Sequence, residues 1–177
     1  MQVSILKEKQ ADERRVAATP DTVAKFIELG YDVKIEAGAG EKASIPDNLY
    51  RDAGATVSKT AEETIKKADL ILFVQRPDHE LLKQAPKNSV AVGMAGPYGD
   101  KADLTGLAET GVTTCTMELL PRITRAQGMD VLSSQANLAG YRAVLDACEY
   151  FDRAMPMMMT AAGTIPPARV FVMGAGV

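Results

Sequence analysis

Hydrogen-bonding side chains crowd one short stretch of the sequence, RITRAQGMDVLSSQANLAGY, which runs from Arg122 to Tyr141 and leads into a predicted helix. Arg122, Gln127, Asp130 and Ser133 all fall at its start. A primary carboxamide needs both hydrogen-bond donors and acceptors around it, and the Arg, Asp and Ser side chains together supply both. These residue types therefore indicate a site that orients a carboxamide, the group that a nicotinamide ring carries.

Part of this stretch also has a purely structural explanation. Asp130 stands where the N-cap of the following helix is expected, three residues before Ser133, and the helix dipole favours a carboxylate there. A cap alone does not explain why Arg122 and Gln127 converge on the same short loop. We therefore keep both the capping role and the carboxamide-binding role as predictions.

The sequence offers no obvious catalytic base. The one histidine, His79, lies among charged residues at a predicted helix start, which favours a solvated surface position. Cys115 and Cys148 have no CxxC spacing and no nearby histidine, so they predict neither a zinc site nor a disulfide. An enzyme that oxidises an alcohol or an amine must move a proton as well as a hydride, and it usually keeps a His or Lys side chain for that step.

A glycine pair closes the sequence. The segment RVFVMGAGV, residues 169–177, predicts a short β run followed by Gly174 and Gly176. In dinucleotide-binding folds the first such glycine makes a tight turn and the second lets the backbone approach a pyrophosphate. The third glycine, the helix and the acidic residue of that motif do not follow in the sequence, so a tight turn at a strand end is the alternative.

The elements that must position these residues alternate along the chain. Short apolar runs rich in β-branched residues are separated by segments of helical length, and Thr19, Pro20 and Gly30 mark the limits of the first helix. This pattern predicts an α/β fold with a doubly wound, mostly parallel sheet of flavodoxin-like type, covered by helices on both faces. The strands are predicted at 3–6, 32–38, 55–58, 69–74, 89–94 and 113–117, and the helices near 20–29, 47–53, 60–67, 78–85 and 101–110.

From Val131 to about Ala154 the pattern becomes one long helix with apolar or small residues on several faces, which predicts packing on several sides. We interpret it as an inter-domain helix, and we expect the methionines of MPMMM, residues 155–159, to fill gaps in a core or an interface. The predicted domains are an N-terminal α/β domain, an active-site loop with the inter-domain helix, and the start of a truncated Rossmann NAD-binding domain. Their limits are 1–125, 126–154 and 155–177.

Composition excludes several classes of partner. The formal net charge is −3 and no basic tract is present, so neither nucleic acid nor an anionic membrane is expected to bind. No apolar window approaches the roughly 18 residues of a membrane span, so we expect a soluble piece without direct membrane insertion. Two cysteines without a disulfide pattern fit a reducing, cytosol-like compartment.

Four segments carry a resemblance to a known family. The stretch that begins at Arg122, ERRVAATP at 13–20, EAGAG at 36–40 and TAAGTIPPARVFVMGAGV at the end closely resemble the NAD(H)-binding domain of the proton-translocating nicotinamide nucleotide transhydrogenases, their alpha or alpha-1 subunit. The resemblance spans the whole chain. It implies direct hydride transfer from NADH to NADP(H) bound on a partner domain, and because no substrate proton is handled in that step, a missing base is expected.

The resemblance also assigns roles to individual residues. Arg122, Asp130 and Ser133 would hold the nicotinamide of NAD(H), while Gln127 would reach toward the NADP ribose on the partner, which makes Gln127 and Asp130 the catalytic candidates. The resemblance also implies that Gly174, Gly176 and Val177 lie near the pyrophosphate of NAD(H).

The same resemblance implies an assembly. Its members form a homodimer and work with an NADP-binding domain and a membrane domain, and proton movement belongs to the membrane domain. The expected location is cytoplasmic, peripheral on the inner face of the bacterial plasma membrane, or on the matrix side in mitochondria.

Two alternatives remain open. The related alanine dehydrogenases share ERRVAxTP and the glycine-rich close, but they carry a substrate-binding lysine where Gln75 stands here, and a catalytic histidine that VAVGMAGP lacks. Arg15 matches their substrate-carboxylate arginine, or it is a structural residue paired with Glu8 or Glu13. The second alternative is a non-catalytic dimerisation or folding module without nucleotide affinity.

Overall fold

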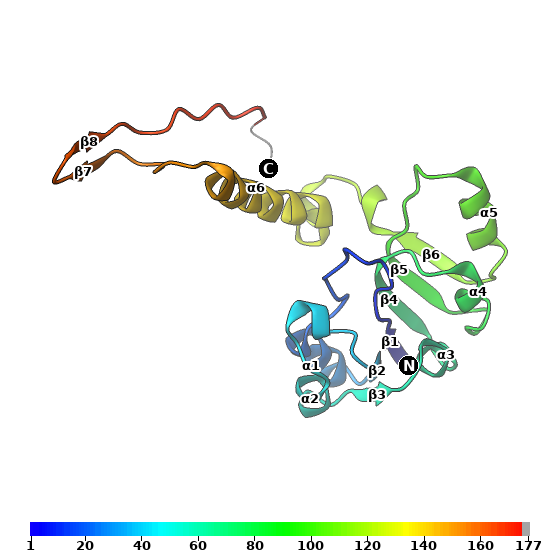
Figure 1. Cartoon of the computed structure of the whole chain (residues 1–177). Helices are drawn as coiled ribbons and strands as arrows, with labels where there is room; N and C mark the ends of the chain where they lie inside the picture. Colours follow the sequence, from blue (N-terminus) through cyan, green and yellow to red (C-terminus); the bar gives the residue numbers. More distant parts are fainter. Residues whose placement is uncertain (175–177) are drawn as a thin grey trace. The chain divides into compact units, whose positions relative to one another are not determined.

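A six-stranded parallel sheet forms the N-terminal portion of the computed structural model, which describes residues 1–174 (Figure 1). The strands are β1 (Gln2–Ile5), β2 (Asp32–Glu36), β3 (Thr56–Ser58), β4 (Leu70–Gln75), β5 (Val90–Met94) and β6 (Thr113–Thr116). All six predicted strands are confirmed, within two residues at each end. Every neighbouring pair is parallel, as expected when helices connect consecutive strands.

The strand order is β3-β2-β1-β4-β5-β6. The doubly wound sheet is therefore confirmed, but its order is the 3-2-1-4-5-6 order of dinucleotide-binding folds and not the 2-1-3-4-5 order of flavodoxin-like ones. The hydrophobic pattern shows where strands occur but not which strands become neighbours, which explains the difference. Between β1 and β4 the order reverses direction, and ligands of such sheets bind at the carboxyl ends of the strands near this switch point.

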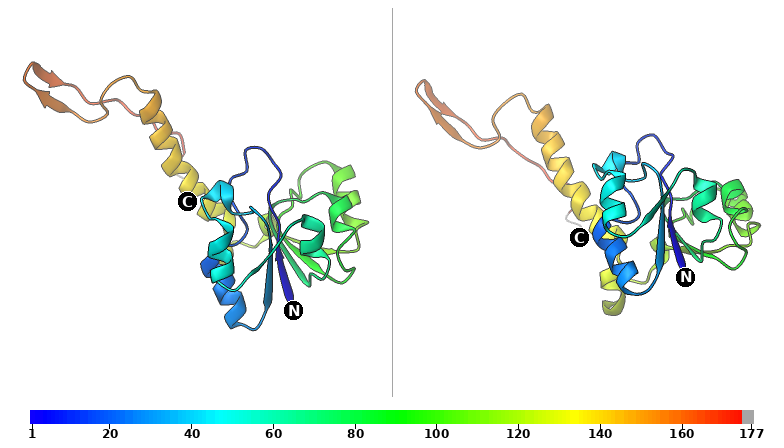
Figure 2. Two further views of the ribbon diagram at one scale, coloured as in Figure 1. Left: turned by 60° about the horizontal axis from the view of Figure 1, so that its bottom comes forward. Right: turned by 90° about the horizontal axis from the view of Figure 1, so that it is seen from below.

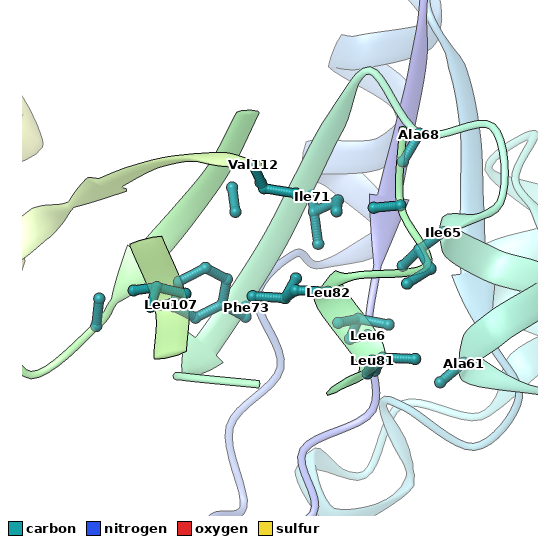
Figure 3. Close-up of a cluster of buried hydrophobic side chains, with 13 residues drawn as sticks. Leu6, Ala61, Ile65, Ala68, Ile71, Phe73, Leu81, Leu82, Leu107 and Val112 are labelled. Carbon is teal, nitrogen blue, oxygen red and sulfur yellow. The ribbon is translucent and has the colours of Figure 1, made fainter. Parts of the chain in front are cut away.

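Helices cover the two faces of the sheet in separate groups (Figure 2). One buried cluster joins α1 and α2 to β1 and β2, and it includes Val23, Tyr50, Ile5 and Ile35. A second cluster joins α3, α4 and α5 to β4 and β5, and Figure 3 shows Ile65, Leu82 and Leu107 of these helices around Ile71 and Phe73. The helices are α1 (Pro20–Glu28), α2 (Asp47–Asp52), α3 (Ala61–Ile65), α4 (His79–Leu82) and α5 (Lys101–Ala108), with a 3-10 turn η1 (Glu41–Ala43) between β2 and α2.

The start of α1 follows the sequence signals closely. Thr19 is its N-cap, and the side-chain hydroxyl accepts a hydrogen bond from the backbone N–H of Thr22 at 3.3 Å. Pro20 occupies the first turn, where its missing N–H costs nothing. At the other end Gly30 adopts a φ of +84°, a left-handed conformation that glycine tolerates and that ends the helix.

Replacing Thr19 with alanine is expected to lower the free energy of unfolding by about 1 kcal/mol, because an orphan N–H of the first turn loses its acceptor. Urea denaturation of the two proteins measures this difference. A Thr19→Ser variant, which keeps the hydroxyl, serves as the control and is expected to retain most of the stability. An unchanged midpoint in the alanine variant would show that the cap contributes nothing.

The chain divides into two units, Met1–Pro121 and a second that begins at Arg122. The second unit contains a 3-10 turn η3 (Thr124–Met129), the long helix α6 (Val131–Tyr150), and an antiparallel hairpin of β7 (Met158–Thr160) and β8 (Gly163–Ile165). The long helix is confirmed, although it ends at Tyr150 and not near Ala154. None of its residues is buried, so the predicted packing on several sides is not formed within the described residues.

Two expectations for the end of the chain are corrected. The segment at 158–165, which we expected as methionines followed by a loop, forms the β7–β8 hairpin, and its Met159 is 84% exposed, so it fills no core among the described residues. The alternative, that the methionines fill an interface, stays a prediction. Residues 169–173, expected as a β run, are in no strand. A strand needs a neighbour for its N–H and C=O groups, and no other described segment pairs with this one.

No helix in the described part of the chain combines the length and the apolar character that crossing a membrane requires.

Candidate functional site

Asp130 and Ser133 are in direct contact at the start of α6. One carboxylate oxygen of Asp130 accepts a hydrogen bond from the backbone N–H of Ser133 at 3.0 Å, and the other accepts one from the Ser133 hydroxyl at 2.5 Å. The carbonyl oxygen of Asp130 also accepts a hydrogen bond from the Ser134 hydroxyl at 2.9 Å. Asp130 is thus the N-cap of α6, and the same contacts hold both its carboxylate oxygens in place.

The carboxylate of Asp130 is stabilised in its charged form. Hydrogen bonds from the Ser133 side chain and then from the Ser133 backbone lower the pKa of Asp130, and the positive charge of Arg122 lowers it further. Of the four residues that the sequence singled out, the structure joins Asp130 and Ser133 by hydrogen bonds.

Gln127 belongs to the same loop but is placed differently. It lies exposed in η3, and its main-chain oxygen accepts a hydrogen bond from the backbone N–H of Asp130 at 3.3 Å. The turn is anchored by Ala126, which is 4% exposed and whose N–H donates to the Ile123 carbonyl at 2.9 Å. The backbone of Gln127 is thus tied to the Asp130 cap while the residue faces solvent.

The glycine motif at the chain end is described only in its first residue. Gly174 has a φ of +98°, in the left-handed region that favours glycine, which fits a tight turn at this position. Gly176 and Val177 lie outside the described residues. Contact of these three residues with a pyrophosphate stays a prediction.

A second polar cluster lies at the carboxyl ends of β1 and β4, the switch point of the sheet. The pairing of β4 with β5 shifts register between Leu72 and Gln75, and Glu8 binds the backbone of β4 in this region. Its carboxylate accepts hydrogen bonds from the backbone N–H groups of Val74 at 2.6 Å and Gln75 at 3.1 Å. Burial raises the pKa of Glu8, because the charged form is harder to solvate there.

Arg15 and Gln75 meet at a second carboxylate of this cluster. The guanidinium of Arg15 donates to Glu13 at 2.6 and 2.8 Å, and the side-chain amide of Gln75 donates to Glu13 at 3.0 Å. These bonds, the one from Arg15 first, lower the pKa of Glu13 to about 2. Of the two structural pairings considered for Arg15, the one with Glu13 is formed.

The cavity beside this cluster is small. It has a volume of about 60 Å³ and is lined by residues 6–10, Phe73, residues 75–78 and Leu81. Ligand pockets usually measure about 300–1,000 Å³, so this cavity accommodates a few water molecules and not a nucleotide. His79 belongs to neither cluster. It is half-buried at the start of α4, with its ring beside Gly106 of α5, so it is less solvated than the sequence indicated.

Known proteins resemble the chain over its whole length. It is 46% identical to an NAD(P) transhydrogenase alpha subunit of Rhodospirillum rubrum, covering 100% of this chain and 47% of that protein. To the alanine dehydrogenase of Methanococcus maripaludis it is 30% identical, covering 100% and 48%. A solved transhydrogenase from Sinorhizobium meliloti matches 99% of this chain and 52% of its own, with a TM-score of 0.95 and 52% identity.

The chain spans about half the length of the curated relatives it matches. Two family models cover nearly all of it. The model of the alanine dehydrogenase/PNT C-terminal domain matches residues 143–177, and that of the N-terminal domain matches residues 4–139. The chain therefore belongs to the alanine dehydrogenase/PNT family.

Proposed function

We propose that this chain is the NAD(H)-binding part of a proton-translocating NAD(P) transhydrogenase, which positions NADH for direct hydride transfer to NADP on a partner domain. The observation that carries the proposal is the pair of hydrogen bonds by which Ser133 holds both carboxylate oxygens of Asp130. Similarity supports it, since the chain is 46% identical to a transhydrogenase alpha subunit and 30% identical to an alanine dehydrogenase.

The three side chains match the two ends of a carboxamide. A carboxylate has about four lone-pair sites, so Asp130 keeps acceptor capacity for the amide N–H groups after binding Ser133. Arg122 supplies donors for the carbonyl oxygen. The nicotinamide itself supplies the hydride chemistry when bound, and the residues of the chain fix the orientation of the ring, which is a proximity effect and needs no proton acceptor.

The remaining roles belong to the same proposal. Gln127, which is exposed in η3, reaches toward the NADP ribose on the partner domain. Gly174, Gly176 and Val177 approach the pyrophosphate of NAD(H). NADP(H) is bound by the partner domain, a membrane domain moves the proton, and the assembly works on the inner face of the bacterial plasma membrane or the matrix side in mitochondria.

We also propose that the complete subunit is a homodimer. Large apolar side chains are exposed along α6 and the hairpin, among them Leu138, Val144, Tyr150 and Met159. Extended apolar surface of this kind marks contact with another chain or another part of the same protein. A Met-rich hairpin suits such a contact, because the flexible thioether side chain adapts to a partner surface.

Alanine-dehydrogenase-like amino-acid oxidation is the second candidate, and Arg15 is the residue that favours it. Against it, the guanidinium already donates to Glu13, and Gln75 at the end of β4 also donates to Glu13. The resemblance associates substrate binding in alanine dehydrogenases with a lysine at position 75. Gln75 is neutral and does not supply that cationic amine.

The test uses the full-length subunit that contains this chain, mixed with the NADP-binding domain. NADH oxidation is expected to depend on both the partner domain and an NADP analogue whose reduced form absorbs at its own wavelength. No NADH oxidation is expected with pyruvate and ammonia. Turnover with pyruvate and ammonia, without reduction of the NADP analogue, would establish the second candidate. If the subunit neither oxidises NADH nor binds it, the remaining interpretation is a non-catalytic folding or dimerisation module.

A further inference from the structure

We propose that Glu118 is a positioning residue for the coenzyme loop, because it fixes the point from which the chain enters the segment that begins at Arg122. This inference rests on the proposed function. Glu118 lies in the 3-10 turn η2 (Met117–Leu119), which follows β6 directly. It touches neither of the two polar clusters described above, so its hydrogen bonds need another explanation.

The carboxylate of Glu118 ties the end of β6 to the loop after β5. It accepts hydrogen bonds from the backbone N–H groups of Gly96 at 2.8 Å and Ala95 at 3.3 Å, and a short one from the Thr116 hydroxyl. Gly96 has a φ of +65°, which turns its N–H toward the same carboxylate as that of Ala95. Three donors from two elements therefore converge on one side chain.

Arg76, at the end of β4, holds the other side of the same loop. Its guanidinium donates to the Ala95 carbonyl at 3.2 Å and to the Asp103 carboxylate of α5 at 2.6 Å. The N–H of Ala95 is thus bound by Glu118 while its C=O is bound by Arg76. The carboxyl ends of β4, β5 and β6 are locked together by this pair of charged residues.

Glu118 remains charged in this setting. Burial raises its pKa, but the hydrogen bonds from Thr116 and from the backbone of Gly96 outweigh that effect, and the net pKa is lowered. Hydrogen bonds to an ionised acceptor are stronger than those to a neutral one. A neutral amide at this position cannot reproduce them, since its NH2 group would face an N–H donor.

The distance along the chain from this anchor to the coenzyme loop is short. Four residues lead from Glu118 to Arg122, which at full extension span at most about 14 Å. Leu120 closes η2 through its N–H to the Met117 carbonyl at 3.3 Å, and Pro121 fixes its own φ. The anchor therefore lies only a few residues before Arg122, so releasing Glu118 is expected to loosen the chain just before the loop.

The experiment uses the full-length subunit with the NADP-binding domain and compares Glu118→Gln with Glu109→Gln, an exposed control that loses the same charge at the end of α5. The Kd for NADH, measured by fluorescence titration, is expected to rise about fivefold in Glu118→Gln, as for the loss of one hydrogen bond. The rate at saturating NADH is expected to change less than twofold, and the control is expected to match the parent protein.

A second variant keeps the inference testable if Glu118→Gln folds poorly. Thr116→Val removes one donor to the carboxylate and is expected to raise the Kd in the same direction, by about twofold. A lower unfolding midpoint with an unchanged Kd in both variants would overturn the inference, since a merely structural role gives that result. Arg122→Ala distinguishes failure of the proposed function from failure of the role of Glu118. If Arg122→Ala leaves the Kd for NADH unchanged, the proposed function fails. If Arg122→Ala raises this Kd and Glu118→Gln does not, only the role of Glu118 is refuted.

Discussion

Replacing Glu13 with glutamine is expected to lower the free energy of unfolding by on the order of 3 kcal/mol at pH 7. The pKa of this buried carboxyl is lowered from 4.5 to about 2, first by the hydrogen bond from Arg15. Each pKa unit corresponds to about 1.4 kcal/mol of differential stabilisation. Glutamine keeps the shape of the side chain but removes the charge that binds Arg15, so it removes this contribution.

The pH dependence identifies the cause. A carboxyl whose pKa is lowered in the folded state contributes its full stability above the unfolded value of 4.5, and the contribution is lost as the pH falls toward the folded value of about 2. Urea denaturation of both proteins between pH 7 and pH 3 is therefore expected to show a difference that shrinks below pH 4.5. Glu28→Gln, at the exposed end of α1, is the control. A difference that stays constant over this range would assign the effect to packing.

Much of the fold could be predicted because its signals are local. The apolar runs of the strands are rich in β-branched residues, and Thr19, Pro20 and Gly30 mark the ends of α1 by their own conformational preferences. The order of the strands is a different kind of property. It depends on which edge of the growing sheet each crossover reaches, and no single segment of the sequence encodes that choice.

The irregular regions escaped prediction because they depend on distant partners. Glu8 binds the backbone of β4 near its register shift, although it lies 66 residues before Val74. Gly93 in β5 allows a close approach to β4, since an added Cβ would lie 2.2 Å from the Phe73 carbonyl oxygen. Residues 169–173 have the composition of a strand without a neighbour to pair with among the described residues. Propensity favours a conformation, but the ladder of hydrogen bonds decides whether a strand forms.

In the candidate site, too, local contacts could be predicted and contacts between distant residues could not. Asp130 and Ser133 are three residues apart on a helix start, so their contact could be predicted from spacing alone, and it is confirmed. The hydrogen bond from Gln75 to Glu13 joins residues 62 positions apart, and the three donors to Glu118 come from two different elements. Only the fold reveals these contacts. Part of the second cluster could be predicted locally, because Arg15 was expected to pair with Glu8 or Glu13 of the same short segment, and the pairing with Glu13 is formed.

Hydride transfer in the complete complex is expected to fall at least about tenfold when Asp130 is replaced with asparagine. Asparagine is as good an N-cap as aspartate, so the first turn of α6 keeps its acceptor. The change removes the negative charge, and it turns one acceptor oxygen into an NH2 group that faces the amide of the nicotinamide. Orientation is lost while the helix is retained. The measurement is the rate of reduction of an NADP analogue by NADH at saturating concentrations.

The unfolding midpoint shows whether a lower hydride-transfer rate in Asp130→Asn comes from lost orientation of the ring or from a less stable helix. If Asp130 acts on the coenzyme, Asp130→Asn is expected to lower the free energy of unfolding by at most about 1 kcal/mol, from the lost charge at the helix start, while the rate falls at least about tenfold. Asp152→Asn, the same change at an exposed position beyond the end of α6, is expected to alter neither quantity. Equal rates for Asp130→Asn and the parent would leave Asp130 with its capping role alone, because a group that orients the ring cannot lose its charge and its second acceptor without cost. The contact with Ser133 would then be explained entirely by the start of the helix.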